Sequence, residues 1–67
     1  MKIDKIEGNK FRLARKRLRW DGQKVSQRMI ADRLGCSTET INLIENDHVK
    51  VGATKWAYAF LLGLLKH

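Results

Sequence analysis

The apolar residues of the chain recur three and four positions apart, which is the spacing of amphipathic helices, and nowhere alternate strictly with polar residues. Segments of this kind, separated by stretches that contain Gly, Asn or Asp, predict helices over residues 9–20, 26–34, 37–46 and 55–66. Residues 1–8 precede the first helix, and we expect them to form a flexible arm that ends at Gly8. The pattern therefore predicts one compact all-α domain over residues 1–67, without strands.

Short polar residues stand at the expected starts of the helices, where their side chains can accept hydrogen bonds from backbone N–H groups. These residues are Asn9, Ser26, Ser37 and Thr54. Gly35 follows the second helix, where a residue with positive φ often ends a helix. The side chains expected to face inward are Phe11, Leu13, Ala14, Arg17 and Leu18 from the first helix, Met29, Ile30, Ala31 and Leu34 from the second, and Ile41 and Ile44 from the third.

The segment over residues 55–66 is apolar around most of its circumference, and only Lys55 and Lys66 interrupt it. A helix of this kind must be buried on more than one side. A chain of 67 residues has few other elements to cover it, so we expect one face to pack on the first three helices and another on a second copy of the chain. The expected interface consists of Trp56, Tyr58, Leu61, Leu62 and Leu65. A lopsided core with an exposed patch is the alternative.

The charge of the chain indicates which classes of partner it binds. The net charge is +7, and six of the 14 Lys and Arg residues lie between Lys10 and Arg19. Such a balance favours polyanions, either nucleic acid or an anionic membrane surface. The apolar run from Trp56 to Leu65 is far shorter than the roughly 20 residues of a spanning helix, and no secretory signal is visible. We therefore expect a cytoplasmic protein that does not enter the membrane.

The sequence gives little support for an enzyme. A single cysteine, Cys36, excludes an intramolecular disulfide, and with only His48 and His67 beside it a Cys/His metal site is not expected. There is no nucleophile–base arrangement, no pair of carboxylates at a useful spacing and no Gly-rich phosphate loop. We therefore expect neither an enzyme nor a cofactor, and no small-molecule ligand is evident.

The stretch from Ser26 to Asp47 places two short helices around a turn that contains Gly35. It resembles the helix-turn-helix of the Cro/cI/XRE family of bacterial and phage regulators, and the resemblance covers about residues 10–47. The matching positions are Ser26, Gln27, Ile30, Ala31, Leu34, Gly35, Ser37, Thr40, Ile41, Ile44 and Glu45. The chain departs from the family pattern at Cys36, at Asn42 and at Asp47, where the family has an aliphatic residue, serine and glycine. The compact layout is similar to small phage and mobile-element regulators, including anti-CRISPR-associated repressors.

The resemblance implies a λ repressor-like, four-helix DNA-binding domain. Its expected function is that of a sequence-specific repressor that binds double-stranded DNA as a homodimer on an inverted repeat and regulates its own promoter in a bacterial or phage-infected cell, at the nucleoid. The alternative is an antitoxin or adaptor whose last helix binds a different protein chain. Binding to RNA, or to DNA without sequence preference, is a further possibility that the basic charge leaves open.

The start of the third helix carries the expected base-reading side chains, since the N-terminal part of a helix in the major groove reaches the base edges. These are Thr38, Glu39 and Asn42, with Leu43 for a thymine methyl group. Asn42 can pair with adenine and Glu39 can accept from cytosine, although Glu39 could equally face solvent near the helix N-terminus. The residues expected to contact phosphate are Lys24, Gln27, Arg28, Thr40, Asn46, His48 and Lys50. The resemblance also implies a structural ion pair between Arg17 and Glu45. Arg15 is the alternative partner, and an exposed Glu45 is the third possibility.

Overall fold

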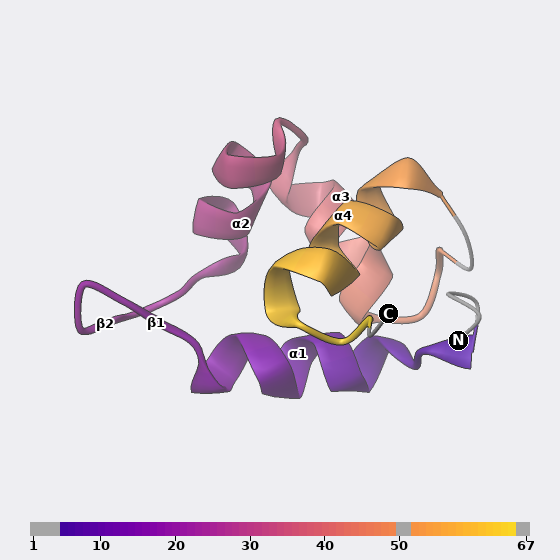
Figure 1. Cartoon of the computed structure of the whole chain (residues 1–67). Helices are drawn as coiled ribbons and strands as arrows, with labels where there is room; N and C mark the ends of the chain where they lie inside the picture. Colours follow the sequence, from indigo (N-terminus) through magenta and orange to yellow (C-terminus); the bar gives the residue numbers. More distant parts are fainter. Residues whose placement is uncertain (1–4, 50–51, 66–67) are drawn as a thin grey trace.

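The computed structural model describes residues 5–49 and 52–65 of the chain. Its elements are α1 (Gly8–Arg17), β1 (Arg19–Trp20), β2 (Gln23–Lys24), α2 (Gln27–Leu34), α3 (Thr38–Glu45) and α4 (Ala53–Leu62). Figure 1 shows α1 along one side of the molecule, with the other helices stacked above it and the two strands projecting beside α2. The expectation of a small, compact and mostly helical domain is confirmed, whereas the expectation that no strand forms is wrong.

The projecting element is a β-hairpin in which Arg19 lies opposite Lys24 and Trp20 lies opposite Gln23. The two residues of its turn both have positive φ, 53° at Asp21 and 78° at Gly22. Positive φ at both central residues is the mark of a type I′ turn, whose twist suits antiparallel strands, and Asp-Gly is one of its preferred sequences. The first helix therefore ends at Arg17 rather than at residue 20, and Leu18 is already extended.

Short polar residues begin α2 and α3, as the sequence indicates. The Ser26 hydroxyl accepts from the backbone N–H of Met29 at 3.1 Å, and the Ser37 hydroxyl accepts from that of Thr40 at 3.2 Å. Gly35 ends α2 with φ of 73°, in the left-handed region. These caps hold the two helices to eight residues each and fix the turn between them.

The core lies where α1, α2, α3 and α4 meet. Phe11, Ile30, Ile41, Ile44 and Tyr58 are its largest apolar or aromatic side chains that are fully buried. The rings of Phe11 and Tyr58 lie 5.0 Å apart between centroids, so that α1 and α4 meet through aromatic contact. Leu13 is 48% exposed, contrary to the expected inward stripe, because it lies two residues, or about 200° of helix rotation, from Phe11.

The last helix begins at Ala53, earlier than the expected residue 55, and ends at Leu62 rather than at residue 66, because Gly63 adopts φ of 74°. Thr54 therefore lies inside the first turn and does not cap it. Among the described residues, no helix has the length and apolar character needed to cross a membrane.

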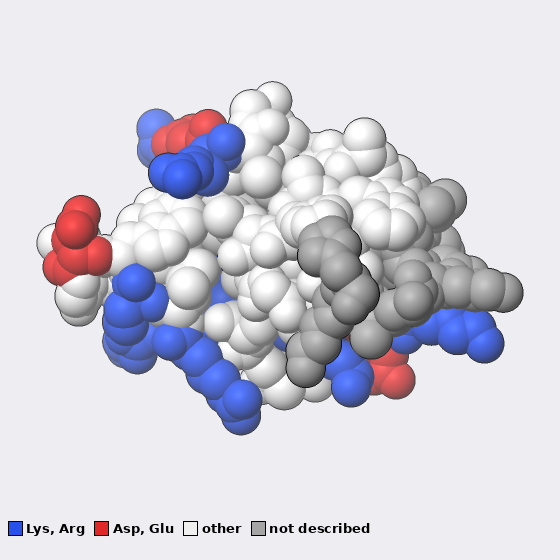
Figure 2. Space-filling view, viewed as in Figure 1, with Lys and Arg blue, Asp and Glu red and all other residues white. Residues whose placement is uncertain are grey.

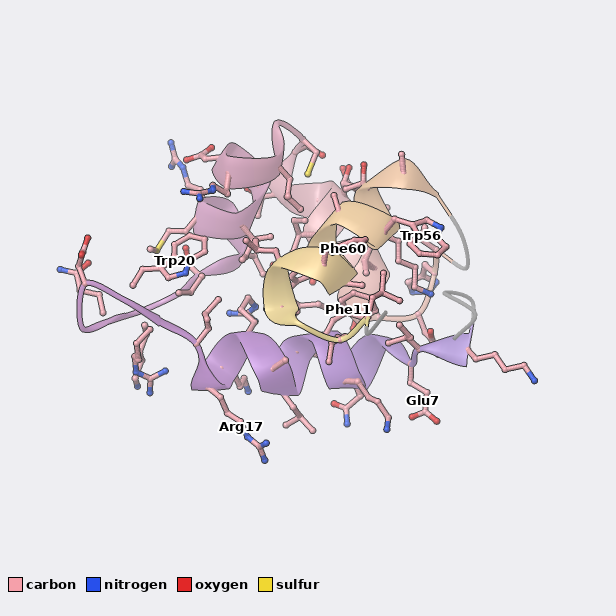
Figure 3. All side chains as sticks on the ribbon, viewed as in Figure 1. Glu7, Phe11, Arg17, Trp20, Trp56 and Phe60 are labelled. Carbon is pink, nitrogen blue, oxygen red and sulfur yellow. The ribbon has the colours of Figure 1, made fainter. Side chains whose placement is uncertain are left out.

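The faces of α4 differ from those expected. Tyr58 is fully buried in the core, so it cannot belong to an interface with a second copy, and Lys55, expected to interrupt the apolar surface, is fully buried too. The Lys55 ammonium lies 5.8 Å from the centroid of the Phe11 ring. The leucines of the expected interface, Leu61, Leu62 and Leu65, are partly buried against the core. Of the expected interface, Trp56 is exposed, at 41%, and the exposed side chain beside it is Phe60, at 52%, which was not among the expected residues (Figure 3).

The beginning of α1 is packed tightly against the end of α3. Ile6 is buried, and the Gly8 N–H donates to the Asp47 carboxylate at 3.2 Å. Residues 6–8 are therefore not part of a flexible arm, while residues 1–4 lie outside the described part of the chain. A Cβ at Gly8 would lie 2.6 Å from the carbonyl oxygens of both Ile44 and Glu45. Only glycine allows the two backbones to approach this closely.

The Gly8→Ala substitution should consequently push α1 away from α3. Forcing a methyl group against backbone atoms typically costs about 1–3 kcal/mol, and we expect a loss of unfolding free energy of that size. Urea denaturation measures it. Asn9→Ala, at the next and exposed position, is the matched control and should leave stability nearly unchanged. Equal stability of the two variants would contradict the close packing of α1 on α3.

Candidate functional site

A buried carboxylate at the end of α3 joins three other helices. The Glu45 side chain is fully buried and accepts hydrogen bonds from Arg15 of α1, at 2.7 Å from Nε and 3.1 Å from Nη2. It also accepts from Gln27 Nε2 of α2 at 3.1 Å and from the Tyr58 hydroxyl of α4. The two oxygens of one side chain thus fix the positions of α1, α2 and α4 around α3.

The expected pairing of Arg17 with Glu45 is wrong, and the alternative partner Arg15 is correct. Arg15 follows Phe11 by four residues and shares its inward face, whereas Arg17 lies about 240° of helix rotation from Phe11. Figure 3 shows Arg17 pointing away from the rest of the protein, and its side chain is exposed.

Arg12 adds a second, more exposed cation, which sequence reasoning missed. Its Nε lies 3.6 Å from Glu45 Oε1, and its Nη2 donates to the Glu45 carbonyl at 3.3 Å and to Asn46 Oδ1 at 2.8 Å. Arg12 and Arg15 are three residues apart, so they are neighbours on the surface of α1. This spacing beside the buried Phe11 is the signal that could have indicated both arginines.

The titration of the cluster follows from its geometry. Burial alone would raise the pKa of the Glu45 carboxyl, but the hydrogen bonds from Arg15, Tyr58 and Gln27 outweigh it and hold the pKa below its usual 4.5. The hydrogen bond to Glu45 raises the pKa of the Arg15 guanidinium, against the effect of burial. Burial, and then the hydrogen bond to Glu45, raise the pKa of the Tyr58 hydroxyl far above its usual range. At neutral pH the cluster is therefore an ion pair with a neutral tyrosine.

The same cluster orients the exposed surface of α3 through Gln27. The Gln27 Nε2 that donates to Glu45 also lies 3.3 Å from Asn42 Oδ1, which accepts a second hydrogen bond from Asn46 Nδ2 at 3.0 Å. Both lone pairs of Asn42 Oδ1 are thereby engaged. Asn42 is exposed, so its Nδ2 group remains available to donate to a partner outside the protein.

The other residues expected to contact DNA differ in exposure. Thr38 and Glu39 lie exposed in the first turn of α3, and Leu43 is half-buried. The Thr40 hydroxyl is shared with Ser37 at 2.8 Å, so its first role is in the helix cap. Exposed side chains near the two helices are those of Lys24, Arg28, Asn46 and His48, while Lys50 lies outside the described residues.

The turn after α3 has a left-handed backbone conformation at Asp47. Asp47 has φ of 66°, the left-handed conformation for which glycine is preferred and which Asp and Asn tolerate best among the other residues. Its carboxylate also accepts the hydrogen bond from Gly8 N–H, which glycine could not do.

Comparisons of the chain with protein-family models, with curated proteins and with solved structures find no match. Within the described part of the chain, no group of three or more His, Cys, Asp or Glu side chains could hold a metal ion. Cys36 is a free thiol, partly buried against the core.

The Arg15→Gln variant tests the buried ion pair by its pH dependence. Because the folded-state pKa of Glu45 lies below 4.5, its stabilising contribution is complete above pH 4.5 and is lost as the pH falls through the folded-state value. We expect Arg15→Gln to cost about 3 kcal/mol at neutral pH, since it leaves a buried charge poorly compensated. The cost should shrink in acid, where Glu45 becomes neutral.

Urea denaturation at neutral and at acidic pH measures both values. Arg17→Gln removes the same charge from the exposed face of the same helix and should cost little at either pH. A cost of Arg15→Gln that does not change with pH would contradict the assigned role of Glu45.

Proposed function

We propose that the chain is a sequence-specific regulator that binds double-stranded DNA through a helix-turn-helix formed by α2 and α3 and acts as a homodimeric repressor on an inverted repeat. The observation that carries the proposal is the exposed polar start of α3, whose Asn42 is held through Gln27 by the buried Glu45. A side chain held in one orientation on a rigid helix can discriminate between base edges, because less conformational entropy is lost on binding.

The dimensions and charge of the two helices support the same proposal. A helix fits the major groove of B-DNA, and the exposed Thr38, Glu39 and Asn42 stand on the part of α3 that would enter it. The N-terminus of α2 directs backbone N–H groups outward beside the exposed Arg28, which suits a phosphate. The net charge of +7 adds the attraction that nonspecific binding to DNA requires.

The hydrogen bonds of Asn42 within the protein indicate which base atoms it would contact. A bidentate contact with adenine needs both the oxygen and the nitrogen of the amide. Since Oδ1 already accepts from Gln27 and Asn46, Nδ2 is the atom left to contact a base. We therefore propose that Asn42 donates to an acceptor in the major groove, the N7 or O6 of a purine, rather than pairing bidentately with adenine.

The exposed apolar side chains of α4 support the proposed homodimer. Trp56 and Phe60 are about one helical turn apart on one face, and both are about half exposed. An inverted repeat requires two copies related by a two-fold axis, and a self-complementary apolar patch is the simplest contact that provides it.

The experiment that tests the function is selection of bound duplexes from a random DNA pool, followed by sequencing. Enrichment of an inverted repeat with fixed spacing between its half-sites supports a dimeric, sequence-specific regulator. Absence of enrichment at about 150 mM salt, where nonspecific contacts weaken, would reject sequence-specific binding.

The role of Asn42 is tested on the selected duplex. We expect Asn42→Ala to weaken binding by about 1–3 kcal/mol, or roughly fivefold to 150-fold, and to relax the preference at one base pair of each half-site. Arg28→Gln is the control, because loss of a phosphate contact should weaken selected and random duplexes alike. Unchanged selectivity in Asn42→Ala would remove this residue from base reading.

The α4 contact is tested by sedimentation equilibrium. Phe60→Glu should convert a dimer to a monomer, because it places a charge in the proposed interface at a position that contributes little to the core. Leu13→Glu, at an equally exposed apolar position on α1, should remain dimeric. A wild-type protein that stays monomeric on the selected duplex as well as without DNA would refute the homodimer and favour a different protein chain as the partner of α4.

A further inference from the structure

The hairpin forms one wall of a cleft lined almost entirely by cations. The cleft has a volume of about 410 Å³ and lies between the C-terminal part of α1, the hairpin and Val25, which directly follows β2. Its lining residues are Arg15, Lys16, Arg19, Lys24 and Val25. Figure 2 shows Lys and Arg side chains at this end of the molecule, below the hairpin and along the end of α1.

Three of these cations lack a carboxylate partner in the described part of the chain. Glu45 pairs with Arg12 and Arg15, and within the described residues Lys16, Arg19 and Lys24 form no ion pair that would neutralise them. Moreover, Arg19 lies directly opposite Lys24 in the hairpin, and like charges at paired positions destabilise a sheet. Arg19 Nη1 is held at this place by the carbonyl oxygens of Lys16, at 2.7 Å, and Leu18, at 2.9 Å. Folding thus holds together charges that repel one another.

The cleft is connected to Asn42 of α3 through Arg15. Arg15 Nη1 donates to the Val25 carbonyl at 3.0 Å, while the rest of the same guanidinium binds Glu45. Glu45 in turn binds Gln27, which contacts Asn42. The cleft and Asn42 are therefore joined by one chain of hydrogen bonds that runs through Arg15, Glu45 and Gln27.

We propose that this cleft binds a backbone phosphate of the same DNA duplex whose bases α3 reads, with Lys16, Arg19 and Lys24 as its contacts. This inference rests on the proposed function. A phosphate would relieve the repulsion between Arg19 and Lys24, and a contact on a hairpin joined to α1 and α2 would set the angle at which α3 enters the groove. The hairpin is then a second clamp on the DNA backbone, beside the N-terminus of α2.

The experiment compares two double variants of equal charge. Lys16→Gln/Lys24→Gln removes two cations from the cleft, whereas Lys10→Gln/Arg17→Gln removes two exposed cations of α1 that do not line it. Either change lowers the net charge by two, from +7 to +5 (7 − 2 = 5). Fluorescence anisotropy with a random-sequence duplex, repeated over a range of salt concentrations, gives the affinity and its dependence on salt.

Affinity falls as salt rises, and in the cleft variant this fall of log affinity with log salt should be less steep by about one for each lysine. The variant should also weaken binding to selected and random duplexes by the same factor. The control variant should change the slope much less. The thermal midpoint of the cleft variant also distinguishes a contact with DNA from a structural role of the two lysines. Because Lys24→Gln relieves repulsion with Arg19, the cleft variant should unfold at the same temperature as wild type or at a higher one.

Equal slopes in the two double variants would overturn the proposal, because charge alone would then explain the binding. A lower thermal midpoint that accounts for the lost binding would overturn it too. Vesicles containing phosphatidylserine are the second probe, and weaker vesicle binding with unchanged duplex binding would assign the cleft to a lipid headgroup and reject DNA. The slopes are measured on random duplexes and do not depend on a selected sequence. A result that rejects sequence-specific binding is therefore distinguishable from a result that rejects the phosphate site in the cleft.

Discussion

The arrangement of the helices depends on the burial of one carboxylate. Removing Glu45 from water carries a desolvation cost of several kcal/mol, which only well-placed hydrogen bonds and an opposite charge can offset. Arg15, Gln27 and Tyr58 supply them from α1, α2 and α4, so a shift of any of these helices would leave the charge poorly compensated. In a chain of 67 residues, whose core is small, this requirement specifies one packing arrangement among the several that the apolar residues would permit.

The same requirement makes a short helix a rigid surface. An isolated helix of eight residues is unstable in water, so α3 must take its stability from its neighbours. Its inner face is anchored by Ile41 and Ile44, and its C-terminal end by Glu45 and by the close approach of Gly8. Asn42 is exposed at the edge of this anchored face and is oriented by Gln27, which itself binds Glu45. The stability of the core and the orientation of the exposed amide therefore have a common cause.

Local signals in the sequence predict the helices well, whereas choices that depend on tertiary packing are not visible in it. Ser26, Ser37 and Gly35 act where their chemistry places them, because caps depend on a few neighbouring residues. The hairpin was missed because its strands have two residues each, too few for alternation, although Asp21-Gly22 was a usable signal. The partner of Glu45 depends on the rotation of α1, which places Phe11 and Arg15 on the inner face and Arg17 outside. The buried Lys55 and Tyr58 show that hydropathy alone does not identify the inner face of a helix that is apolar on most sides.

The distribution of charge allows the two proposed contacts to exist together. Figure 2 shows few charged atoms over α4, while Lys and Arg side chains gather at the edges of this view, along α1 and near the hairpin. The exposed Trp56 and Phe60 thus lie away from the cationic cleft, and a second copy bound to α4 would not compete with a polyanion for the same surface. A dimer formed through α4 would also bring two copies of a +7 chain together, a repulsion that bound DNA phosphates would reduce. Dimer formation and DNA binding would on this argument strengthen each other, and the dimer would be weaker without DNA and weaker at low salt, where charges are least screened.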